Sequence, residues 1–385
     1  PLYHPRRPKT EADHKVAQWG PRGLPSPAYA FKAERVFPMT SAPIHKGVVL
    51  TKDGLIVAVG KQGELEIPEG YEVVDLGKHW IMPGFVDLHC HIASQSFDLN
   101  DTVHQTNPEF RTLDLITLEE PQVKKALAGG ISSVLYIPGS GSNMGGFGTL
   151  TKTAGRTPQE ALIRFPGSLK IAQAGNPERR SGDLGLTRMG MNQNLRFSLE
   201  RGRKYYEAWE AFYRGEAPQP ELDPALENLR GLFRHEYPVS VHTQIYQVVL
   251  STLRELRTEM DLWTVIVHGT FDAYRLTEEA SKLGVVVANG PRQYHYDRTA
   301  ARFIGLADAW YAGGQHGWSK PVRGLGRDGI AINTDSPVIP QEQLPLQTAM
   351  AVRLGLPWEL GLLGITINPA RMVGIDHRVG SQDVG

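Results

Sequence analysis

The sequence predicts an α/β protein, a (β/α)8 barrel preceded by a small β-rich segment. Three observations lead to this fold class. From residue 85 onward, short apolar runs alternate with amphipathic stretches, which is typical of parallel βα units. The 385 residues can hold such a barrel, which takes about 250 residues, and an appendage. Ahead of the first apolar run, Asp53 and Gly54 join two β-branched runs and predict a hairpin.

The chain divides into four predicted segments. Residues 1–27 are rich in Pro, Arg, Lys and Gly without an apolar period and predict an extended arm. Residues 28–80 contain the hairpin and predict a small antiparallel sheet. Residues 81–373 predict the barrel, and residues 374–385 predict the exit from it.

Seven barrel strands are predicted directly from apolar runs, and the eighth is either Gly148–Lys152 or Leu162–Phe165. The seven strands are Phe85–His89, Ser132–Ile137, Ser168–Gln173, Pro238–His242, Trp263–His268, Val285–Asn289 and Gly329–Asn333. The helices expected between and around them are Pro121–Ala128, Glu200–Tyr213, Pro224–His235, Tyr246–Glu259, Asp272–Leu283 and Pro345–Leu354.

Composition limits the partners of the chain. The 41 basic and 41 acidic residues cancel, so no net field favours nucleic acid or an anionic membrane. The single cysteine, Cys90, rules out an internal disulfide and a cysteine-rich zinc site. No apolar run of about 20 residues is present. We therefore expect a soluble protein, and because its first residue is Pro rather than Met, both a cytoplasmic location and export after removal of a leader stay open.

Residues able to bind a metal follow four of the predicted strands. His89 and His91 lie two positions apart, so both rings leave the same face of a strand. His242, His268 and Asp335 end three further runs. In a (β/α)8 barrel the carboxyl ends of all strands meet at one mouth, and neutral imidazole is the commonest metal ligand. The order of these residues therefore predicts one metal site.

At this point the chain resembles the amidohydrolase superfamily of metal-dependent hydrolases, and specifically its imidazolonepropionase-like branch. The resemblance implies a TIM-like barrel joined to a small β-sandwich. It extends from about Lys32 to Gly385. The motifs that carry it are Pro83–His91, Val241–His242, Val267–Thr270, Asn333–Pro337 and Ile365–Arg371.

The resemblance also implies roles for the predicted ligands. His89, His91, His242 and His268 would hold divalent metal, with zinc the default for nitrogen-rich ligation. One ion is expected, and a second is left open. Asp335 would contribute to the metal site and move a proton from water to the leaving nitrogen. Independently of the resemblance, Asp87 shares the strand parity of His89 and His91 and lies one layer deeper, so we expect it to be an acceptor that fixes an imidazole tautomer.

The implied function is hydrolysis of a C–N bond in a small cyclic or linear amide by metal-activated water. Two alternatives stay open. One is a catalytically degenerate subunit of an assembly that keeps only the fold. The other is a deaminase of a ring substrate, which would use the same ligands and a different pocket.

The chain departs from the family at the fourth strand and at its end. Dinuclear relatives supply a carboxylated Lys or a Glu from that strand, where this chain offers Lys170, early in the run, and Gln173, a neutral amide. The site is therefore mononuclear, bridged by a carboxylated Lys170, or degenerate. The sequence also ends at Gly385, where relatives return to the small sheet. We expect an incomplete β-sandwich, completed by a complementary chain, by an oligomer partner or by sequence outside this stretch.

Two loops are further candidates. Arg292, Tyr294 and His295 follow the seventh strand and either contact a substrate carboxylate or carbonyl or lie in solvent. The glycine-rich stretch Ile137–Gly148 approaches a dinucleotide fingerprint, but its spacing is one residue too long. Its glycines favour close packing of the backbone at the mouth instead.

Overall fold

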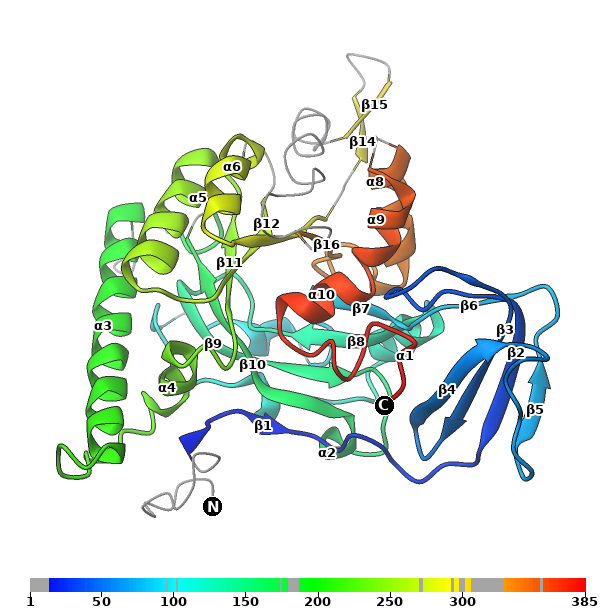
Figure 1. Cartoon of the computed structure of the whole chain (residues 1–385). Helices are drawn as coiled ribbons and strands as arrows, with labels where there is room; N and C mark the ends of the chain where they lie inside the picture. Colours follow the sequence, from blue (N-terminus) through cyan, green and yellow to red (C-terminus); the bar gives the residue numbers. More distant parts are fainter. Residues whose placement is uncertain are drawn as a thin grey trace.

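The computed structural model describes residues 14–94, 96–101, 103–173, 175–178, 187–269, 273–291, 294–297, 302–305, 329–353 and 356–385. Its central feature is a sheet whose eight strands curl almost into a closed barrel, in the order β16-β13-β12-β11-β10-β9-β8-β7 (Figure 1). A β-bridge between Cys90, the last residue of β7, and Ser336, in the segment after β16, links the two ends of this order. This sheet confirms the predicted barrel fold. Its strands are β7 (Phe85–Cys90), β8 (Ile131–Tyr136), β9 (Met144–Lys152), β10 (Leu162–Ala172), β11 (Val239–Thr243), β12 (Thr264–His268), β13 (Val286–Asn289) and β16 (Ile330–Ile332).

One barrel strand differs in direction from the prediction. Strand β9 pairs antiparallel with both β8 and β10, whereas the remaining neighbours in the barrel pair in parallel. The two segments proposed for the eighth strand are both extended, but 162–165 opens β10 and 148–152 closes β9. The connection 137–143 is too short for a crossover helix, so β9 must run back beside β8.

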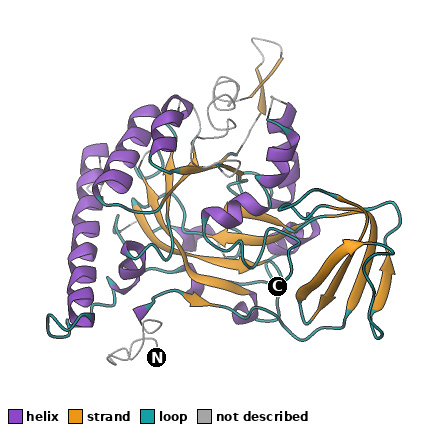
Figure 2. Ribbon diagram, viewed as in Figure 1, coloured by secondary structure: helices purple, strands orange, loops and turns teal. Residues whose placement is uncertain are grey.

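Helices cover the outside of the barrel (Figure 2). Apolar residues of α3 and α4, among them Leu195, Leu199 and Leu229, form one buried cluster with Val239 and Val241 of β11. No helix in the described part of the chain is both long and apolar enough to cross a membrane. The helices are α1 (Pro121–Ala128), α2 (Pro158–Ala161), α3 (Arg188–Tyr213), α4 (Glu227–Phe233), α5 (Tyr246–Thr252), α6 (Thr277–Lys282), α8 (Leu344–Arg353), α9 (Trp358–Leu363) and α10 (Ile367–Met372).

Helix α3 begins earlier than expected, at Arg188 rather than Glu200. The Thr187 side chain accepts a hydrogen bond from Gly190 N and so caps the helix. The predicted helix 246–259 has the expected bounds, but it is α-helical only to Thr252 and continues as a π-helix, Leu253–Glu259.

The barrel interior is filled with apolar side chains below the mouth. One buried cluster combines residues of seven barrel strands, including Leu88 of β7, Ile163 of β10 and Ala331 of β16. Ala370 and Met372 of α10 pack against the same cluster. This part of the barrel is therefore a packed core, and the predicted ligands lie at the carboxyl ends of the parallel strands.

A second sheet precedes the barrel in the chain, in the order β4-β3-β2-β5 with β6 beside β2. The predicted hairpin is present between β3 and β4, and Asp53 and Gly54 both adopt positive φ (53° and 72°), as a primed turn requires. Strands β5 and β6 pair with β2 in parallel, so the sheet is mixed rather than antiparallel. The strands are β2 (Tyr29–Val36), β3 (Ile44–Lys52), β4 (Leu55–Lys61), β5 (Glu72–Asp75) and β6 (Trp80–Ile81).

Both ends of the described chain lie against these sheets. Within the predicted arm, β1 (Gln18–Trp19) pairs antiparallel with β10, and residues 1–13 lie outside the described part. At the other end, Gly385 N donates to Ile56 O of β4 at 2.9 Å. The segment 374–385 thus leads from the barrel to the edge of the small sheet.

Candidate metal centre

Three of the predicted ligands form a tight group at the barrel mouth. One ligand atom from each of His89, His268 and Asp335 lies within 4.8 Å of the others. Asp335 Oδ1 is 3.1 Å from His89 Nε2, and Oδ2 is 3.9 Å from His268 Nε2. These residues come from β7, β12 and the loop after β16, so the barrel brings together side chains that are far apart in the sequence.

The other two predicted ligands border this group. His91 Nε2 lies 3.3 Å from Asp335 Oδ1. The ring of His242 is centred 4.5 Å from the ring of His268. All four imidazoles are buried, with His91 the most exposed at 9%. The structure therefore brings all five predicted ligands to one place.

Local backbone geometry aims these side chains. Between Asp87 and Cys90 the pairing of β7 with β8 shifts register, so β7 contains a bulge. His268 and Asp335 both adopt left-handed backbone, with φ of 73° and 51°. This conformation is unfavourable for residues with a Cβ, and it turns each side chain away from the direction that a regular strand would give it.

Hydrogen bonds fix two of the rings in one tautomer. His91 Nδ1 lies 2.7 Å from Ile137 O, and His268 Nδ1 lies 2.7 Å from Gly290 O. A carbonyl oxygen can only accept, so each Nδ1 carries the proton and each Nε2 offers a lone pair. His242 differs, because its Nδ1 lies 2.8 Å from the hydroxyl of Ser140.

Burial favours the neutral form of three of these imidazoles, as metal binding requires. It lowers the pKa of His268 and lowers the pKa values of His89 and His242 well below the ordinary value. Burial raises the pKa of Asp335, but its contacts with His268, His89 and His91 outweigh this and hold that pKa below its usual range. The site thus combines neutral nitrogen donors with one carboxylate.

The donor set fits a divalent metal. His89 Nδ1 and His268 Nε2 are buried and have no hydrogen-bond partner within the part of the chain that the structure describes. Buried polar atoms are normally satisfied, so such atoms require an explanation. Nitrogen ligands with one carboxylate are the combination that zinc prefers in proteins.

Lys170 also reaches the site, although its early position in the strand made this doubtful from the sequence. Its side chain is fully buried and its Nζ lies 3.3 Å from His89 Nε2. Burial lowers the pKa of this amine to about 7. The other doubtful residue, Gln173, is directed elsewhere: its amide accepts a hydrogen bond from Thr252 and donates to Asn192 at 3.5 Å.

Asp87 does not contact an imidazole ring, contrary to the expectation that it fixes a tautomer. Its Oδ1 accepts from His89 N at 3.0 Å, and its Oδ2 accepts from Thr334 N, Thr334 Oγ1 and Gln341 Nε2. The pairing of β7 with β8 shifts register between Asp87 and Cys90, which interrupts the regular alternation of side chains on which the expectation depended. Burial raises the pKa of Asp87 to about 7 against these hydrogen bonds.

The predicted substrate contacts remain predictions. Arg292 lies outside the described residues. Tyr294 and His295 belong to β14 (Tyr294–Asp297), which pairs with β15 (Arg302–Gly305) in a separate two-stranded sheet. Their side chains are outside the described part of the structure.

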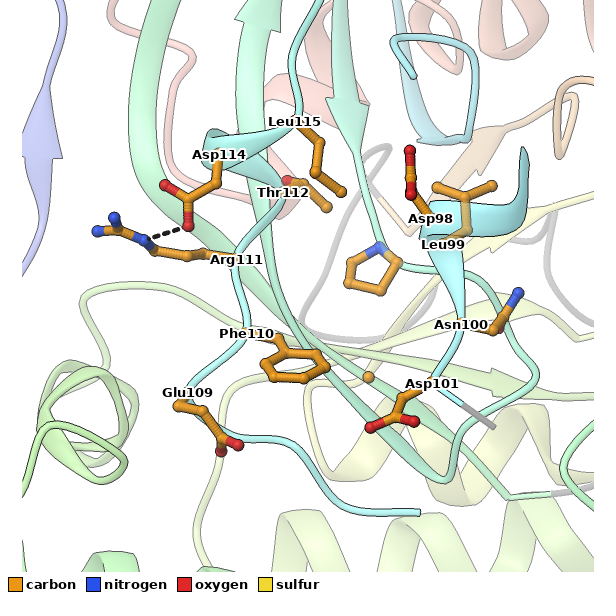
Figure 3. A pocket seen from close by; sticks show the side chains of 12 residues that line it. Asp98, Leu99, Asn100, Asp101, Glu109, Phe110, Arg111, Thr112, Asp114 and Leu115 are labelled. Atoms are coloured by element: carbon orange, nitrogen blue, oxygen red, sulfur yellow. Dashed lines mark hydrogen bonds and ion pairs between the residues drawn. The ribbon is translucent and has the colours of Figure 1, made fainter. Parts of the chain in front are cut away.

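A cavity of about 510 Å³ lies beside the mouth, between the segment 98–101 and the segment 109–115 (Figure 3). Leu99 and Asn100 line one side, and Phe110 and Arg111 line the other. Pro138, from the loop after β8, also lines the cavity.

The loop after β8 also carries Ile137 and Ser140, whose contacts with imidazoles the sequence analysis did not predict. The signal available for them was the run of glycines in the same loop.

The chain is similar over most of its length to known amidohydrolases and imidazolonepropionases. No family model matches the chain. The amidohydrolase tasK of Hapsidospora irregularis is 25% identical over 377 residues, which cover 88% of this chain but only 37% of that protein. The imidazolonepropionase of Pseudomonas entomophila (strain L48) is 21% identical over 382 residues, covering 89% of this chain and 86% of that protein. The crystal structure of an amidohydrolase from Thermotoga maritima MSB8 superposes with a TM-score of 0.78 and 29% identity, covering 93% and 91% of the two chains.

Proposed function

Because this chain belongs to the amidohydrolase superfamily, we propose that it is a metal-dependent hydrolase that cleaves the C–N bond of a cyclic or linear amide. The observation that carries the proposal is the group formed by His89, His268 and Asp335. Neutral imidazoles and an ionised carboxylate meet there at the carboxyl ends of parallel strands, which is where barrel enzymes place their chemistry.

The residues divide into ligands and a proton carrier. His89, His91, His242 and His268 would hold the metal, preferentially zinc. When bound, such an ion makes water acidic and polarises a carbonyl. The carboxylate of Asp335 lies 3.1 Å from His89 Nε2 and 3.3 Å from His91 Nε2, beside the nitrogens that would hold the metal, where it would take up a proton from water. It then delivers that proton to the leaving nitrogen, which is general base followed by general acid catalysis.

After carboxylation, Lys170 would supply the negative charge that dinuclear relatives obtain from a Glu or a carboxylated Lys of the fourth strand. With its pKa near 7, a substantial fraction of the amine is neutral at physiological pH. The neutral Nζ attacks the carbon of dissolved carbon dioxide, the N–C bond forms, and an amine proton leaves to water. The product is a carbamate that carries one negative charge, which offsets the charge of a second metal ion better than the neutral amide of Gln173 would.

Metal analysis and turnover test the proposal together. The chain is purified, and its zinc, manganese and iron are quantified before and after treatment with a chelator. Hydrolysis of an imidazolone, a lactam and an N-acyl amino acid is then followed. We expect about one or more equivalents of metal, loss of turnover on chelation and recovery on adding zinc.

His235→Asn is the matched control, because His235 is a surface imidazole, 46% exposed, outside the site. This variant should keep both metal and turnover, whereas His268→Asn should lose both. Less than about 0.2 equivalents of metal in the wild type, with no gain on reconstitution, would overturn the proposal. Native mass spectrometry in bicarbonate buffer tests Lys170 separately, since carboxylation adds the mass of one carbon dioxide and Lys170→Met must abolish it.

A further inference from the structure

The turn Ile137–Gly141, which connects β8 to β9, touches two of the four imidazoles of the metal centre. Ile137 O is 2.7 Å from His91 Nδ1, and Ser140 Oγ is 2.8 Å from His242 Nδ1. Ser140 and His242 are both buried, with exposed fractions of 7% and 4%. A single turn therefore reaches ligands that belong to strands on either side of it, β7 and β11.

The chemistry of these two contacts differs. The carbonyl of Ile137 can only accept, so it permits one tautomer of His91. The hydroxyl of Ser140 can accept or donate, so it permits two tautomers of His242. Only when the hydroxyl accepts from Nδ1–H does His242 Nε2 present a lone pair. The orientation of Ser140 therefore determines whether His242 can act as a ligand through that nitrogen.

Asn100 holds the turn in place from the opposite side. Its Oδ1 accepts from Gly141 N at 2.5 Å, and Gly139 N donates to Leu99 O at 2.9 Å. A Cβ added at Gly139 or Gly141 would approach the Asn100 side chain to 2.5 Å or 2.7 Å, so only glycine allows this close packing. Leu99 and Asn100 both line the neighbouring cavity (Figure 3). Gly139 and Gly141 thus allow Asn100 to pack closely against the turn and to hold Ser140 in place. We call this contact the clamp.

We propose that Ser140 is a positioning residue, which sets His242 Nε2 as a metal ligand, and that Asn100 holds Ser140 at that position. The inference rests on the metal site proposed above, but it concerns residues that are not themselves ligands. A hydrogen bond to the distal nitrogen of a metal-bound His orients the ring, and its loss typically weakens metal binding about 10- to 100-fold.

The chain offers a matched control in the same turn. Ser142 is also buried, at 1% exposed, but its Oγ donates to Asp101 O at 2.9 Å and makes no hydrogen bond with an imidazole of the described residues. Zinc affinity is measured by competition with a chelating dye, and the visible spectrum of the cobalt-substituted protein reports ligand geometry. Ser140→Ala should bind zinc about 10- to 100-fold more weakly with an altered cobalt spectrum. Ser142→Ala should match the wild type in both measurements, and Ser140→Thr, which keeps the hydroxyl, should restore both.

The role of Asn100 is tested with two variants. Asn100→Asp keeps an oxygen that can accept from Gly141 N and should retain near-normal affinity. Asn100→Ala removes the clamp and should weaken zinc binding in the same direction as Ser140→Ala. Circular dichroism and thermal unfolding of every variant establish that the barrel is folded before affinities are compared.

A measurement on metal-free protein separates this inference from the proposed function. In protein labelled with ¹⁵N-histidine, the wild-type His242 should show a protonated Nδ1, and Ser140→Ala should shift it toward a mixture of tautomers. Failure of the wild type to bind metal would refute the proposed function while leaving this test intact. Identical His242 nitrogen shifts in wild type and Ser140→Ala, or an equal loss of affinity in Ser142→Ala, would overturn the positioning role.

Discussion

Replacing Lys170 by Met should stabilise the metal-free protein, and the gain should depend on pH. The amine is fully buried, and burial lowers its pKa from 10.5 to about 7. Between these values the unfolded chain binds a proton that the folded chain releases, so the wild type gains stability as pH rises. At 1.36 kcal/mol for each pH unit, the cost of burying this amine is about 5 kcal/mol at pH 6 and about 2 kcal/mol at pH 9.

Methionine keeps the length of the side chain and carries no charge. It loses the hydrogen bond with His89, worth about 1 kcal/mol. The free energy of unfolding of the variant should therefore exceed that of the wild type by about 4 kcal/mol at pH 6 and by about 1 kcal/mol at pH 9.

Urea unfolding of metal-free protein at pH 6, 7.5 and 9, in buffer depleted of carbon dioxide, measures the difference. Subtracting the two profiles removes the contribution of every titrating group that does not interact with Lys170. Lys124→Met is the control, because Lys124 is exposed on α1 and the change should leave the profile unaltered. A stability difference that is the same at all three pH values would refute the reasoning, since it would mean that Lys170 keeps an ordinary pKa when buried.

Three further predictions concern other parts of the molecule. Asp335→Asn should lower kcat by about 10²- to 10⁴-fold while the protein keeps its zinc, which steady-state assays with metal analysis check; normal turnover would contradict its role in proton transfer. Asp87→Asn should cost about 2–4 kcal/mol in urea unfolding, because an amide cannot accept all the hydrogen bonds that Thr334 and His89 donate to the carboxylate. Gly202→Ala should cost about 1–3 kcal/mol despite the higher helix propensity of alanine, because the new Cβ would lie 2.6 Å from Leu229 Cδ1; a rise in Tm would show that α3 and α4 can move apart.

The sequence contains enough information for the barrel, but not for the direction of each strand. Alternating apolar runs located all seven strands that follow the βα pattern. Periodicity is the same for parallel and antiparallel strands, so it could not orient the glycine-rich strand Met144–Lys152. The length of the preceding connection is the better signal, because seven residues or so cannot hold a crossover helix. The parallel pairing of Glu72–Asp75 in the small sheet escaped the prediction for the same reason.

The candidate site, like the fold, could be predicted from the sequence only in part. The positions of His89, His91, His242, His268 and Asp335 follow from one rule, that strand ends meet at the mouth. Two neighbouring residues did not follow it. Strand parity predicted that Asp87 lies on the same face as the imidazoles, but β7 has a register shift after Asp87 that the sequence does not indicate, and regular alternation does not hold there. The early position of Lys170 in its strand left open whether it reaches the mouth, but its long side chain brings Nζ to 3.3 Å from His89 Nε2.

The strained backbone at two ligands indicates why the site needs a rigid frame. His268 and Asp335 adopt positive φ, at a cost of about 1–3 kcal/mol each. Neighbouring hydrogen bonds hold both: Gly269 N donates to Thr243 O at 3.0 Å, and Val338 N donates to Asp335 O at 2.8 Å. The carboxylate of Asp87, which ties Thr334 to β7, fixes the residue just before Asp335. Relaxing either backbone would turn its side chain out of the group, so the proposed metal site depends on the packing around the mouth.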